Sequence, residues 1–554
     1  MRISNGVTEP AREHFKSRAE FFLAAAITLV IFYFHFYFWL HVGGLWRDEV
    51  NSINVARQNS IAAMTHDSFP LLMPLLLHGW LAFAKTDLGL RALGLLIGVA
   101  TPVALWFATW KIRRATPLLG LVLFCANTTL ITYGDSLRAY GFGSLLIALV
   151  AAAACFHLQR PNLPRAILFS LFAILSVQTL YQNAVLVAAI CAGSFAVFIR
   201  KKNWNAATQT FFAGTFAAIS LLPYLRTVVS GRASSAVLQT GVDAQTFVAD
   251  ATNAFGFPFE QYTYIWMLLV LAIIAQACFV IFQNQKNVSA ANESDLQLFA
   301  GIVAPLAAIG LSAFLWRAAL SMKFWYLLPL MAVIVVCFDL ARPLAPRWRI
   351  GISIFAAVTM AISIPVLRSD LKYRFTNMDV RLQQMKTHVA HGDYVIVAPW
   401  FCGISFEHYF TDDAQWTTLP PLTDHSTHRY DLVQIQLQNT NAIAPVFEQI
   451  SRTLQSSNQV FILAAHGWME IPERNTPAMS SLPPAPTKNF GWSEMPYTQV
   501  WASQVAHFLA DHSREFARVK SPTEGMRIAE DMELFVASGW ENPGQTNSSS
   551  NPAR

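Results

Sequence analysis

The chain has 554 residues and is poor in charge: Asp, Glu, Lys and Arg make up only 13% of it, whereas 54% is hydrophobic. Soluble globular proteins carry about 25% charged residues. A water-soluble protein of this length is therefore excluded. The same composition excludes collagen-like, disordered and disulfide-scaffold chains, since the chain has only 26 Gly and 6 Cys. What remains is a polytopic membrane protein.

Cysteine and nucleotide-binding motifs are also scarce. Five of the six cysteines lie in apolar runs, which leaves Cys402 alone in the polar part and rules out a disulfide framework there. The chain has no Walker A loop, no G-x-G-x-x-G after a strand and no G-x-S-x-G. A nucleotide-using enzyme is therefore not supported. His425 and His428 have metal-like spacing, but no pattern of Cys or carboxylates surrounds them, which disfavours a zinc site.

The charge that is present divides the chain in two. Residues 1–368 contain 26 Lys and Arg against 14 Asp and Glu, whereas residues 369–554 contain 13 against 19. We expect a short cytoplasmic N-terminus (1–18), a transmembrane domain (19–368), an extracytoplasmic α/β domain (369–540) and a disordered tail (541–554). Basic loops between membrane helices explain the overall positive charge without nucleic acid.

Apolar runs of about 17–25 residues are long enough to cross the hydrocarbon core as helices. The first runs from Phe21 to His41. It is too long for a cleaved signal peptide, and no A-x-A site follows it. The ten later runs cover residues 92–110, 116–133, 139–158, 166–181, 183–199, 207–224, 262–283, 297–316, 324–341 and 350–367. We therefore expect about eleven transmembrane helices.

The bias of Lys and Arg between alternate loops predicts a cytoplasmic N-terminus and an extracytoplasmic C-terminal domain. Two long loops, 42–91 and 225–261, then face outward. The first contains an apolar stretch from Phe69 to Ala84 that two prolines interrupt. We expect this stretch to lie at the membrane surface, because a crossing would turn the basic loops outward.

The C-terminal part alternates helical and strand patterns, which favours a small α/β layer. We expect a buried strand from Tyr394 to Ala398, a later helix and strand over 441–467, an amphipathic helix over 498–513 and a last strand over 532–538.

Charged residues gather where the first transmembrane helix ends. Arg47, Asp48 and Glu49 are consecutive, directly after Gly43-Gly44. A carboxylate at this position could take a proton from an acceptor hydroxyl. The alternative is the start of an interfacial helix, because acidic residues favour helix N-termini.

Further candidates for substrate and phosphate binding follow along the outer loops. His66 and Asp67 precede the surface stretch, where Asp67 could instead cap a helix. Arg138 could clamp a phosphate through its forked guanidinium, or could pair with Asp135. Arg317 and Lys323 flank an aromatic stretch that is also typical of an interface belt.

Taken in this order, these motifs resemble those of the GT-C membrane glycosyltransferases. The resemblance is to the branch with the lipid A aminoarabinose transferase, the protein O-mannosyltransferases and the lipopolysaccharide-core sugar transferases. It rests on Asp48-Glu49, on FPLLMPLLLHGW, on the Arg in DLGLRALGLL, on the R-x-Y pair Arg138 and Tyr140, and on the late YLLP stretch.

The resemblance implies a GT-C-like fold in a cell inner membrane and transfer of a sugar from a polyprenyl-phosphate donor to a glycan, lipid or protein acceptor on the outer face. In such enzymes the first Asp of the pair is the base, which corresponds to Asp48. Basic residues stabilise the departing lipid phosphate, which corresponds to Arg138, Arg317 and Lys323.

A divalent cation such as Mg²⁺ or Mn²⁺ could bind Asp48, Glu49 and Asp67, since hard cations favour carboxylates, but nothing requires one. Two other functions remain open: a non-catalytic binder of lipid-linked glycans on the same fold, and a glycolipid transporter. The expected transmembrane helices contain almost no charge, which counts against an ion-coupled transporter.

Overall fold

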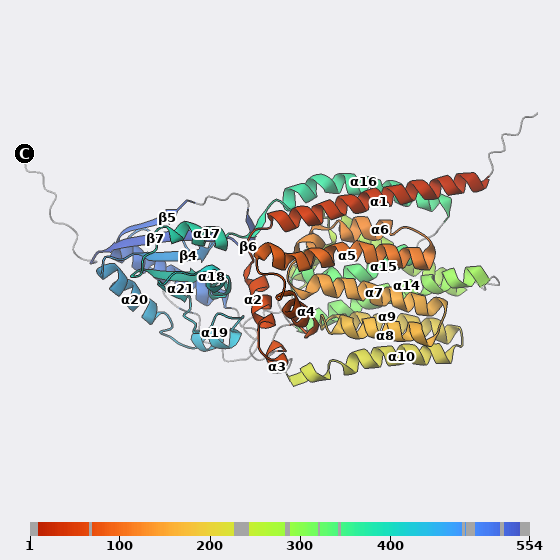
Figure 1. Ribbon diagram of the computed structural model, residues 1–554, viewed down its shortest axis with the longest axis horizontal. Helices are drawn as coiled ribbons and strands as arrows, with labels where there is room; N and C mark the ends of the chain where they lie inside the picture. Colours follow the sequence, from red (N-terminus) through yellow and green to blue (C-terminus); the bar gives the residue numbers. More distant parts are fainter. Residues whose placement is uncertain are drawn as a thin grey trace, which may run out of the picture. The chain divides into compact units, whose positions relative to one another are not determined.

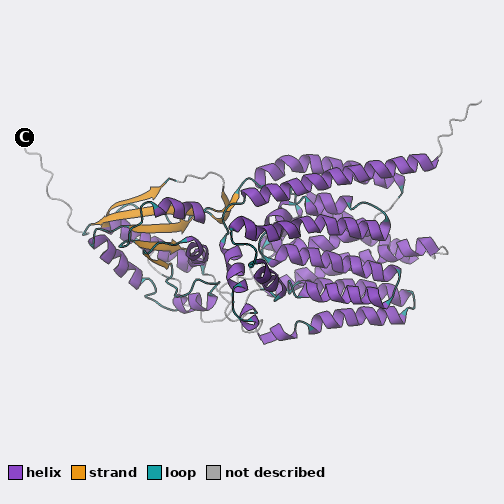
Figure 2. Cartoon of the chain, viewed as in Figure 1, coloured by secondary structure: helices purple, strands orange, loops and turns teal. Residues whose placement is uncertain are grey.

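The computed structural model of the chain describes residues 9–65, 69–226, 243–282, 288–318, 322–341, 345–478, 482, 494–520 and 526–542. These residues form two compact units. The first comprises the described residues of Met1–His41, Gln58–Val228 and Gly241–Lys372, and the second those of Val42–Arg57 and Tyr373–Arg554. Figure 2 shows that the first is helical and that the described strands gather in the second.

The first unit is a bundle of long apolar helices (Figure 1). Eight helices among the described residues are long and apolar enough to cross a membrane. They are α1 (Glu9–His41), α5 (Asp87–Arg113), α7 (Ala139–Gln159), α9 (Asn183–Arg200), α13 (Tyr262–Phe282), α14 (Val288–Ala318), α15 (Leu328–Ala341, extended by the 3-10 turn Phe324–Leu327) and α16 (Pro346–Asp370). Each coincides with one of the eleven expected transmembrane helices, so the membrane-embedded class is confirmed.

The other three expected transmembrane helices are helical but shorter or interrupted. Residues 116–133 form α6 (Leu118–Gly120) and two π-helical turns, Leu121–Cys125 and Leu130–Gly134. The remaining two are α8 (Leu163–Val177) and α10 (Trp204–Ile219), the latter followed by the 3-10 turn Leu222–Tyr224. A count of eleven stays a prediction.

Short elements complete this unit: α3 (Ile61–Met64), α4 (Leu72–Trp80) and α12 (Ala244–Phe255). The apolar stretch predicted to lie at the membrane surface contains α4, which has nine residues. At about 1.5 Å per residue it is far too short to cross a bilayer. Figure 1 shows α4 almost end-on while α5 and α7 run across the view, so α4 crosses the direction of the bundle helices.

A pair of ionisable side chains is buried inside the bundle. His35 on α1 is fully buried, and its Nδ1 lies 2.7 Å from Oδ2 of the buried Asp135. Gly94 and Gly98 of α5 allow this approach, because a Cβ at Gly94 would lie 1.8 Å from the backbone oxygen of Asp135. The pair therefore fixes the turn before α7, the helix whose first residues carry the R-x-Y motif.

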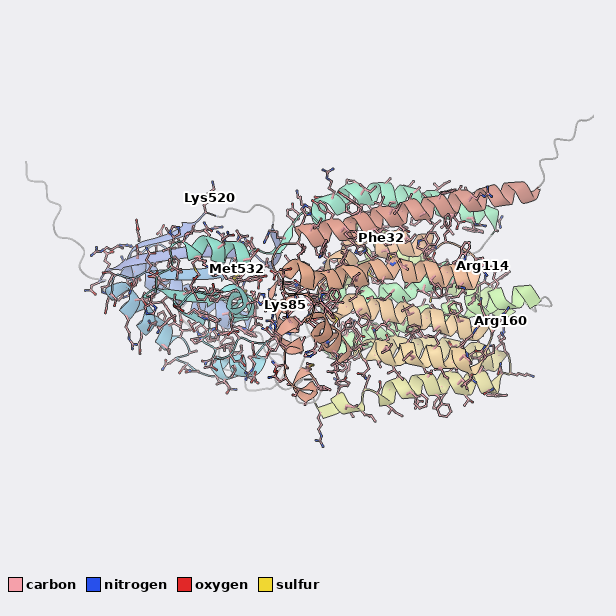
Figure 3. All side chains as sticks on the ribbon, in the orientation of Figure 1. Phe32, Lys85, Arg114, Arg160, Lys520 and Met532 are labelled. Atoms are coloured by element: carbon pink, nitrogen blue, oxygen red, sulfur yellow. The ribbon has the colours of Figure 1, made fainter. Side chains whose placement is uncertain are left out.

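Basic residues that were expected in cytoplasmic loops lie at one end of the helix bundle. Figure 3 shows Arg114 and Arg160 at one end of this unit and Lys85 at the other. Arg114 follows α5 and Arg160 follows α7, and both were expected in cytoplasmic loops. Their common end agrees with the expected arrangement of loops, while the orientation in the membrane stays a prediction.

The second unit contains a five-stranded mixed sheet in the order β3-β2-β4-β7-β5. Strands β2 (Tyr394–Ala398), β3 (Gln415–Thr418) and β4 (Val460–Ala465) are parallel to one another. Strand β7 (Met532–Trp540) is antiparallel to both of its neighbours, β4 and β5 (Ser513–Val519). A separate parallel pair joins β1 (Arg374–Thr376) to β6 (Met526–Glu530). The predicted strand 394–398, the helix 498–513 and the last strand are confirmed, and so is the small α/β layer.

Helices cover both faces of this sheet, because alternate residues of the central strands are buried on opposite sides. Ile396 and Ile462 pack in one core and Val395 and Phe461 in the other. The first core includes residues of α19 (Tyr430–Leu437), α20 (Ala444–Gln455) and α21 (Met495–His512), and the second includes residues of α17 (Met378–Lys386) and α18 (Gly403–Tyr409). A strand buried on both faces reads as a continuous apolar run, as Tyr394–Ala398 does.

The segment Val42–Arg57 belongs to this second unit, although it follows α1 directly. The backbone N–H of Phe375 donates to the oxygen of Val42 at 3.1 Å, and Gly43 forms a parallel bridge with Thr376. Gly43 has φ +81°, a conformation that other L residues rarely adopt. This turn leads into α2 (Arg47–Ala56), the helix that carries the three consecutive charges.

Candidate functional site

Helix α2 places Asp48 in its first turn. Trp46 before the helix is extended, and its backbone N–H donates to Oε2 of Glu49 at 3.4 Å. This is the reach-back contact of the glutamate in a capping box. Glu49 is fully buried, whereas the Asp48 side chain is 21% exposed. Of the two adjacent carboxylates, Asp48 is thus the one that solvent reaches.

The Asp48 carboxylate is paired with a histidine from a distant part of the sequence. Oδ1 of Asp48 lies 3.2 Å from Nε2 of His428, whose side chain is 16% exposed. Residues one and two turns further along α2 hold the histidine segment: Oδ1 of Asn51 accepts from the backbone N–H of His428 at 3.0 Å, and Nδ2 of Asn54 donates to the oxygen of Ser426 at 2.8 Å. The position of the imidazole is therefore set by α2 itself.

Aromatic rings enclose the same group. The imidazole of His428 stacks on Tyr430 with centroids 5.7 Å apart, and the ring of Trp400 meets it edge-on at 6.2 Å. Arg47 lies with its guanidinium 4.6 Å from the ring centre of Phe401, and its Nε is 3.8 Å from Oδ1 of Asp48. We call Arg47, Asp48 and His428 the Asp48 cluster.

Two buried carboxyl groups, those of Glu530 and Glu494, interact electrostatically with Arg47. Ser405 donates its hydroxyl to Oε1 of Glu530 at 2.7 Å, and the Trp400 indole donates to Oε2 of Glu494 at 2.5 Å. Burial raises the pKa of Glu530 to about 7, although Arg47 opposes the shift. Burial also raises the pKa of Glu494 to about 7, against the opposing effect of the Trp400 hydrogen bond.

These raised pKa values predict a pH dependence of stability. An unfolded Glu titrates near pH 4.3. Between that pH and about 7 the folded chain keeps protons that the unfolded chain has lost, so the free energy of unfolding falls as pH rises. We expect Glu530→Gln to stabilise the protein at pH 8 by about 1–3 kcal/mol and to flatten the dependence between pH 5 and 8. Chemical unfolding of the full chain across this range measures both.

The matched control for this prediction is Glu448→Gln, because Glu448 is an exposed residue of α20. Its pH dependence should follow that of the wild type. An unchanged slope in Glu530→Gln would show that Glu530 is ionised in the folded state throughout this range.

In the first unit the R-x-Y motif meets the surface stretch. Arg138 precedes α7 and is 7% exposed, and its guanidinium lies 4.5 Å from the ring centre of Phe69. Tyr140 in the first turn of α7 meets Phe69 edge-on at 5.4 Å and stacks on Tyr326 at 5.7 Å. Three stretches that are far apart in the sequence are thus brought together around one arginine.

The late aromatic stretch extends the same cluster. Tyr133 stacks on Trp325 with centroids 4.2 Å apart and meets Phe324 edge-on at 5.3 Å. The side-chain amide of Gln182 donates to the backbone oxygen of Tyr326 at 2.8 Å. We call Phe69, Arg138, Tyr140 and Tyr326, with the stacked pair Tyr133 and Trp325, the Arg138 cluster.

The other predicted residues are placed as follows. Arg317 lies in the last turn of α14 and is exposed, and Lys323 is exposed directly before the 3-10 turn Phe324–Leu327. Burial raises the pKa of Asp250 on α12, and the charge of Lys323 opposes that shift. Asp135, the alternative partner of Arg138, contacts His35. His66 and Asp67 lie outside the described residues.

Metal binding gains no support from the geometry. Within the described ranges no group of three or more His, Cys, Asp and Glu side chains is arranged to hold an ion. The close neighbour of Asp48 is His428, and Glu49 faces the backbone of Trp46. Asp67, the third residue expected at a cation site, lies outside the described residues.

Sequence reasoning missed His428, Glu494 and Glu530. The HSTH motif was considered for metal binding, yet His428 contacts Asp48, and burial lowers the pKa of His425 to about 4. A pair separated by 380 residues leaves no local pattern in one sequence.

Comparisons with known proteins give a coarse likeness to solved structures. No protein-family model matches the chain, and no curated protein does. Among solved structures, the crystal structure of the Archaeoglobus fulgidus oligosaccharyltransferase in complex with Zn and sulfate has a TM-score of 0.43 and 11% identity. The match covers 79% of this chain and 68% of that chain. At this level the likeness carries no argument about residues, substrate or metal.

Proposed function

We propose that the protein is a membrane glycosyltransferase that moves a sugar from a polyprenyl-phosphate donor to an acceptor hydroxyl, with Asp48 as general base. The observation that carries the proposal is the partly exposed Asp48 carboxylate held against the His428 imidazole. A general base must reach a substrate proton and keep a fixed orientation, and the exposure of Asp48 and its contact with His428 support this role.

The proposed reaction inverts the anomeric centre. The acceptor hydroxyl gives its proton to Asp48 while its oxygen bonds to the anomeric carbon. The bond from that carbon to the phosphate oxygen breaks, and its electron pair leaves with the polyprenyl phosphate. Basic side chains neutralise the leaving group, a role we assign to Arg138, Arg317 and Lys323. The other assigned contacts to substrate come from Arg47, His66, Asp67 and Tyr140.

The proposed location is a cell inner membrane, with the N-terminus cytoplasmic and the α/β domain outside. The eight apolar helices support the embedding, and the bias of Lys and Arg supports the orientation. The acceptor class stays open between glycan, lipid and protein. Glu49 is the proposed alternative to Asp48 as the catalytic base.

A second candidate function is a glycolipid transporter on the same fold. The observation that favours it is the buried pair of His35 and Asp135, since ionisable residues among membrane helices often mark transport or proton pathways. A non-catalytic binder of lipid-linked glycans is a third. Both predict donor binding without turnover.

Sugar transfer in proteoliposomes tests these functions directly. The purified full chain is reconstituted and offered a panel of polyprenyl-phosphate sugars with glycan, lipid and protein acceptors. We expect one donor to be consumed and free polyprenyl phosphate to accumulate in equal amount. Donor that binds without turnover would contradict the transferase and favour the binder. Movement of intact donor across the bilayer would favour the transporter.

We expect His428 to act as a positioning residue for Asp48. In His428→Ala the carboxylate loses its fixed partner, and kcat should fall about 10- to 100-fold with KM for the acceptor little changed, since small misplacements of a reacting group are costly. His428→Gln, which keeps a donor near Asp48, should recover part of the loss. Steady-state kinetics and the pH profile of kcat/KM measure both effects.

The control for this prediction is His391→Ala, in an exposed loop of the same unit. It should retain the activity and pH profile of the wild type. Wild-type kcat in His428→Ala would remove His428 from the proposed site, whatever its effect on stability.

A further inference from the structure

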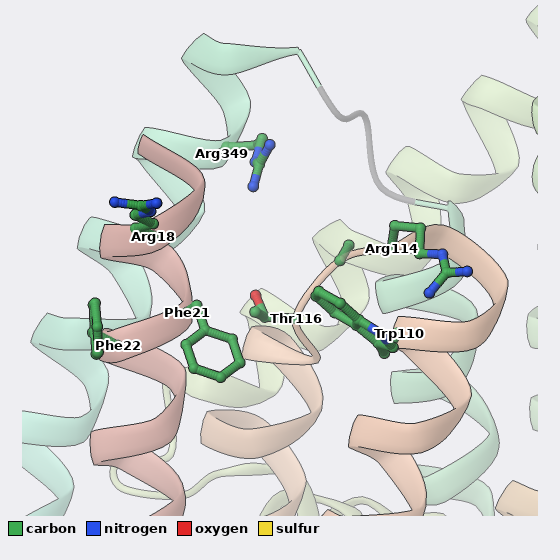
Figure 4. Close-up of a pocket in the computed structure, with 8 residues that line it drawn as sticks. Arg18, Phe21, Phe22, Trp110, Arg114, Thr116 and Arg349 are labelled. Carbon is green, nitrogen blue, oxygen red and sulfur yellow. The ribbon is translucent and has the colours of Figure 1, made fainter. Parts of the chain in front are cut away.

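A cavity opens among the helices α1, α5 and α16 of the first unit (Figure 4). Its volume is about 340 Å³. Its walls are three arginines, three aromatic rings and the small residues between α5 and α6, namely Arg18, Phe21, Phe22, Trp110, Arg114, Ala115, Thr116 and Arg349. None of these residues belongs to the Asp48 or Arg138 cluster.

The lining carries a surplus of positive charge. Nε of Arg349 pairs with Oε2 of the buried Glu20 at 2.7 Å, and the hydroxyl of Thr116 donates to Oε1 of the same carboxylate at 2.5 Å. Glu20 is thereby committed to holding α1 against α16 and the start of α6. In the part of the chain that the structure describes, no ion pair involves Arg18 or Arg114. Three arginines thus line the cavity, and of these only Arg349 is paired with the Glu20 carboxylate in the part of the chain that the structure describes.

The surroundings of the cavity are apolar and exposed. Phe22 is 68% exposed and Trp110 is 43% exposed, and Trp348 on α16 is 52% exposed. Large aromatic surfaces in contact with water would be costly, whereas acyl chains cover them without cost. A ligand that fits both the arginines and this rim has an anionic head and apolar chains.

The position along the bundle agrees with such a ligand. Arg114 follows the last turn of α5, with a left-handed φ of 53°. Figure 3 shows it at the same end of the bundle as Arg160. Basic residues at the ends of membrane helices lie at the level of lipid phosphates, and aromatic residues favour the same interface.

We propose that this cavity binds the phosphate of an anionic phospholipid, with Arg18, Arg114 and Arg349 around the phosphate and the acyl chains along α1 and α5. The site is independent of the proposed glycosyl transfer, because it shares no residue with it. The bound lipid would bridge α1, α5 and α16, adding to the Glu20 network that links α1 with α16 and with Thr116.

Lipid binding to the delipidated full chain tests the proposal. The protein in detergent is titrated with phosphatidylglycerol or phosphatidylcholine, and bound lipid is counted by native mass spectrometry. We expect one tightly retained phosphatidylglycerol per chain and no comparable phosphatidylcholine. Each arginine removed should weaken phosphatidylglycerol binding roughly fivefold, so Arg18→Gln with Arg114→Gln should lose most of it. Arg18→Lys with Arg114→Lys keeps the charge and should retain binding.

Arg160→Gln is the matched control, because Arg160 is a basic residue at the same end that does not line the cavity. It should bind as the wild type does. Equal retention of the two lipids by the wild type, or unchanged phosphatidylglycerol binding in the double Gln variant, would overturn the proposal. Glycerol 3-phosphate and inorganic phosphate should not displace the lipid. Displacement by either would show a free-phosphate site and contradict a lipid site.

Discussion

Asp48→Asn is expected to lower kcat for sugar transfer by about 10²- to 10⁴-fold, the contribution typical of a positioned general base. Asparagine has nearly the same shape, and its side-chain oxygen can keep the contact that Asp48 makes with His428 at 3.2 Å. It cannot take the proton of the acceptor hydroxyl. The KM for the donor should change little, because the substitution alters the chemical step. Initial rates in proteoliposomes, over a range of acceptor concentrations, separate kcat from KM.

The control is Asp413→Asn, the same chemical change at an exposed position before β3. It should leave the rate unchanged. Size-exclusion chromatography and thermal unfolding verify that both variants fold as the wild type does. Wild-type turnover in a folded Asp48→Asn protein would remove Asp48 as the base and direct attention to Glu49 and Asp67.

The sequence predicts well the elements that local patterns determine. Each of the eight long apolar helices coincides with a run of apolar residues, because a helix that crosses a bilayer must be apolar along its whole length. Strand Tyr394–Ala398 was predicted with its exact bounds, since it is buried on both faces of the sheet and is apolar throughout. In these cases the structure follows from the chain's own hydrophobic pattern.

Features that depend on tertiary contacts escape sequence reasoning. Residues 116–133 read as one transmembrane helix, but the structure interrupts them with π-helical turns. The buried carboxylate of Asp339 accepts from the backbone N–H groups of Leu119 and Gly120. A carboxylate from α15 thus satisfies the donors at the start of the interrupted segment, which hydropathy cannot reveal.

The candidate site also contains residues that the sequence identified and contacts that only the fold reveals. Asp48 and Arg138 were identified because they form short motifs, Asp-Glu and R-x-Y. The contacts of Asp48 with His428 and of Arg138 with Phe69 were not predicted, because they form only through the fold. Moreover, Val42–Arg57 packs with the second unit even though it follows α1. The pairing of Val42 and Gly43 with β1 and the contacts of α2 with the His428 segment explain this.

Arg138→Gln is expected to lower kcat by about 10²- to 10³-fold, the loss typical when one preorganised group facing a developing charge is removed. Arg138 is 7% exposed and lies over Phe69, so its charge acts in a poorly hydrated setting where it is strong. Arg138→Lys keeps the charge but loses the planar fork, and should fall between the wild type and the Gln variant. Turnover with the productive donor measures the series.

Binding of the product distinguishes a role at the phosphate from a merely structural one. If Arg138 holds the leaving phosphate, free polyprenyl phosphate should inhibit Arg138→Gln much more weakly than the wild type. Arg160→Gln is the matched control, since Arg160 follows the opposite end of the same helix α7 and is exposed. A lower melting temperature with unchanged product inhibition would assign Arg138 to the packing of Phe69 and Tyr140. The leaving phosphate would then depend on Arg317 and Lys323, which could be tested by the same inhibition assay.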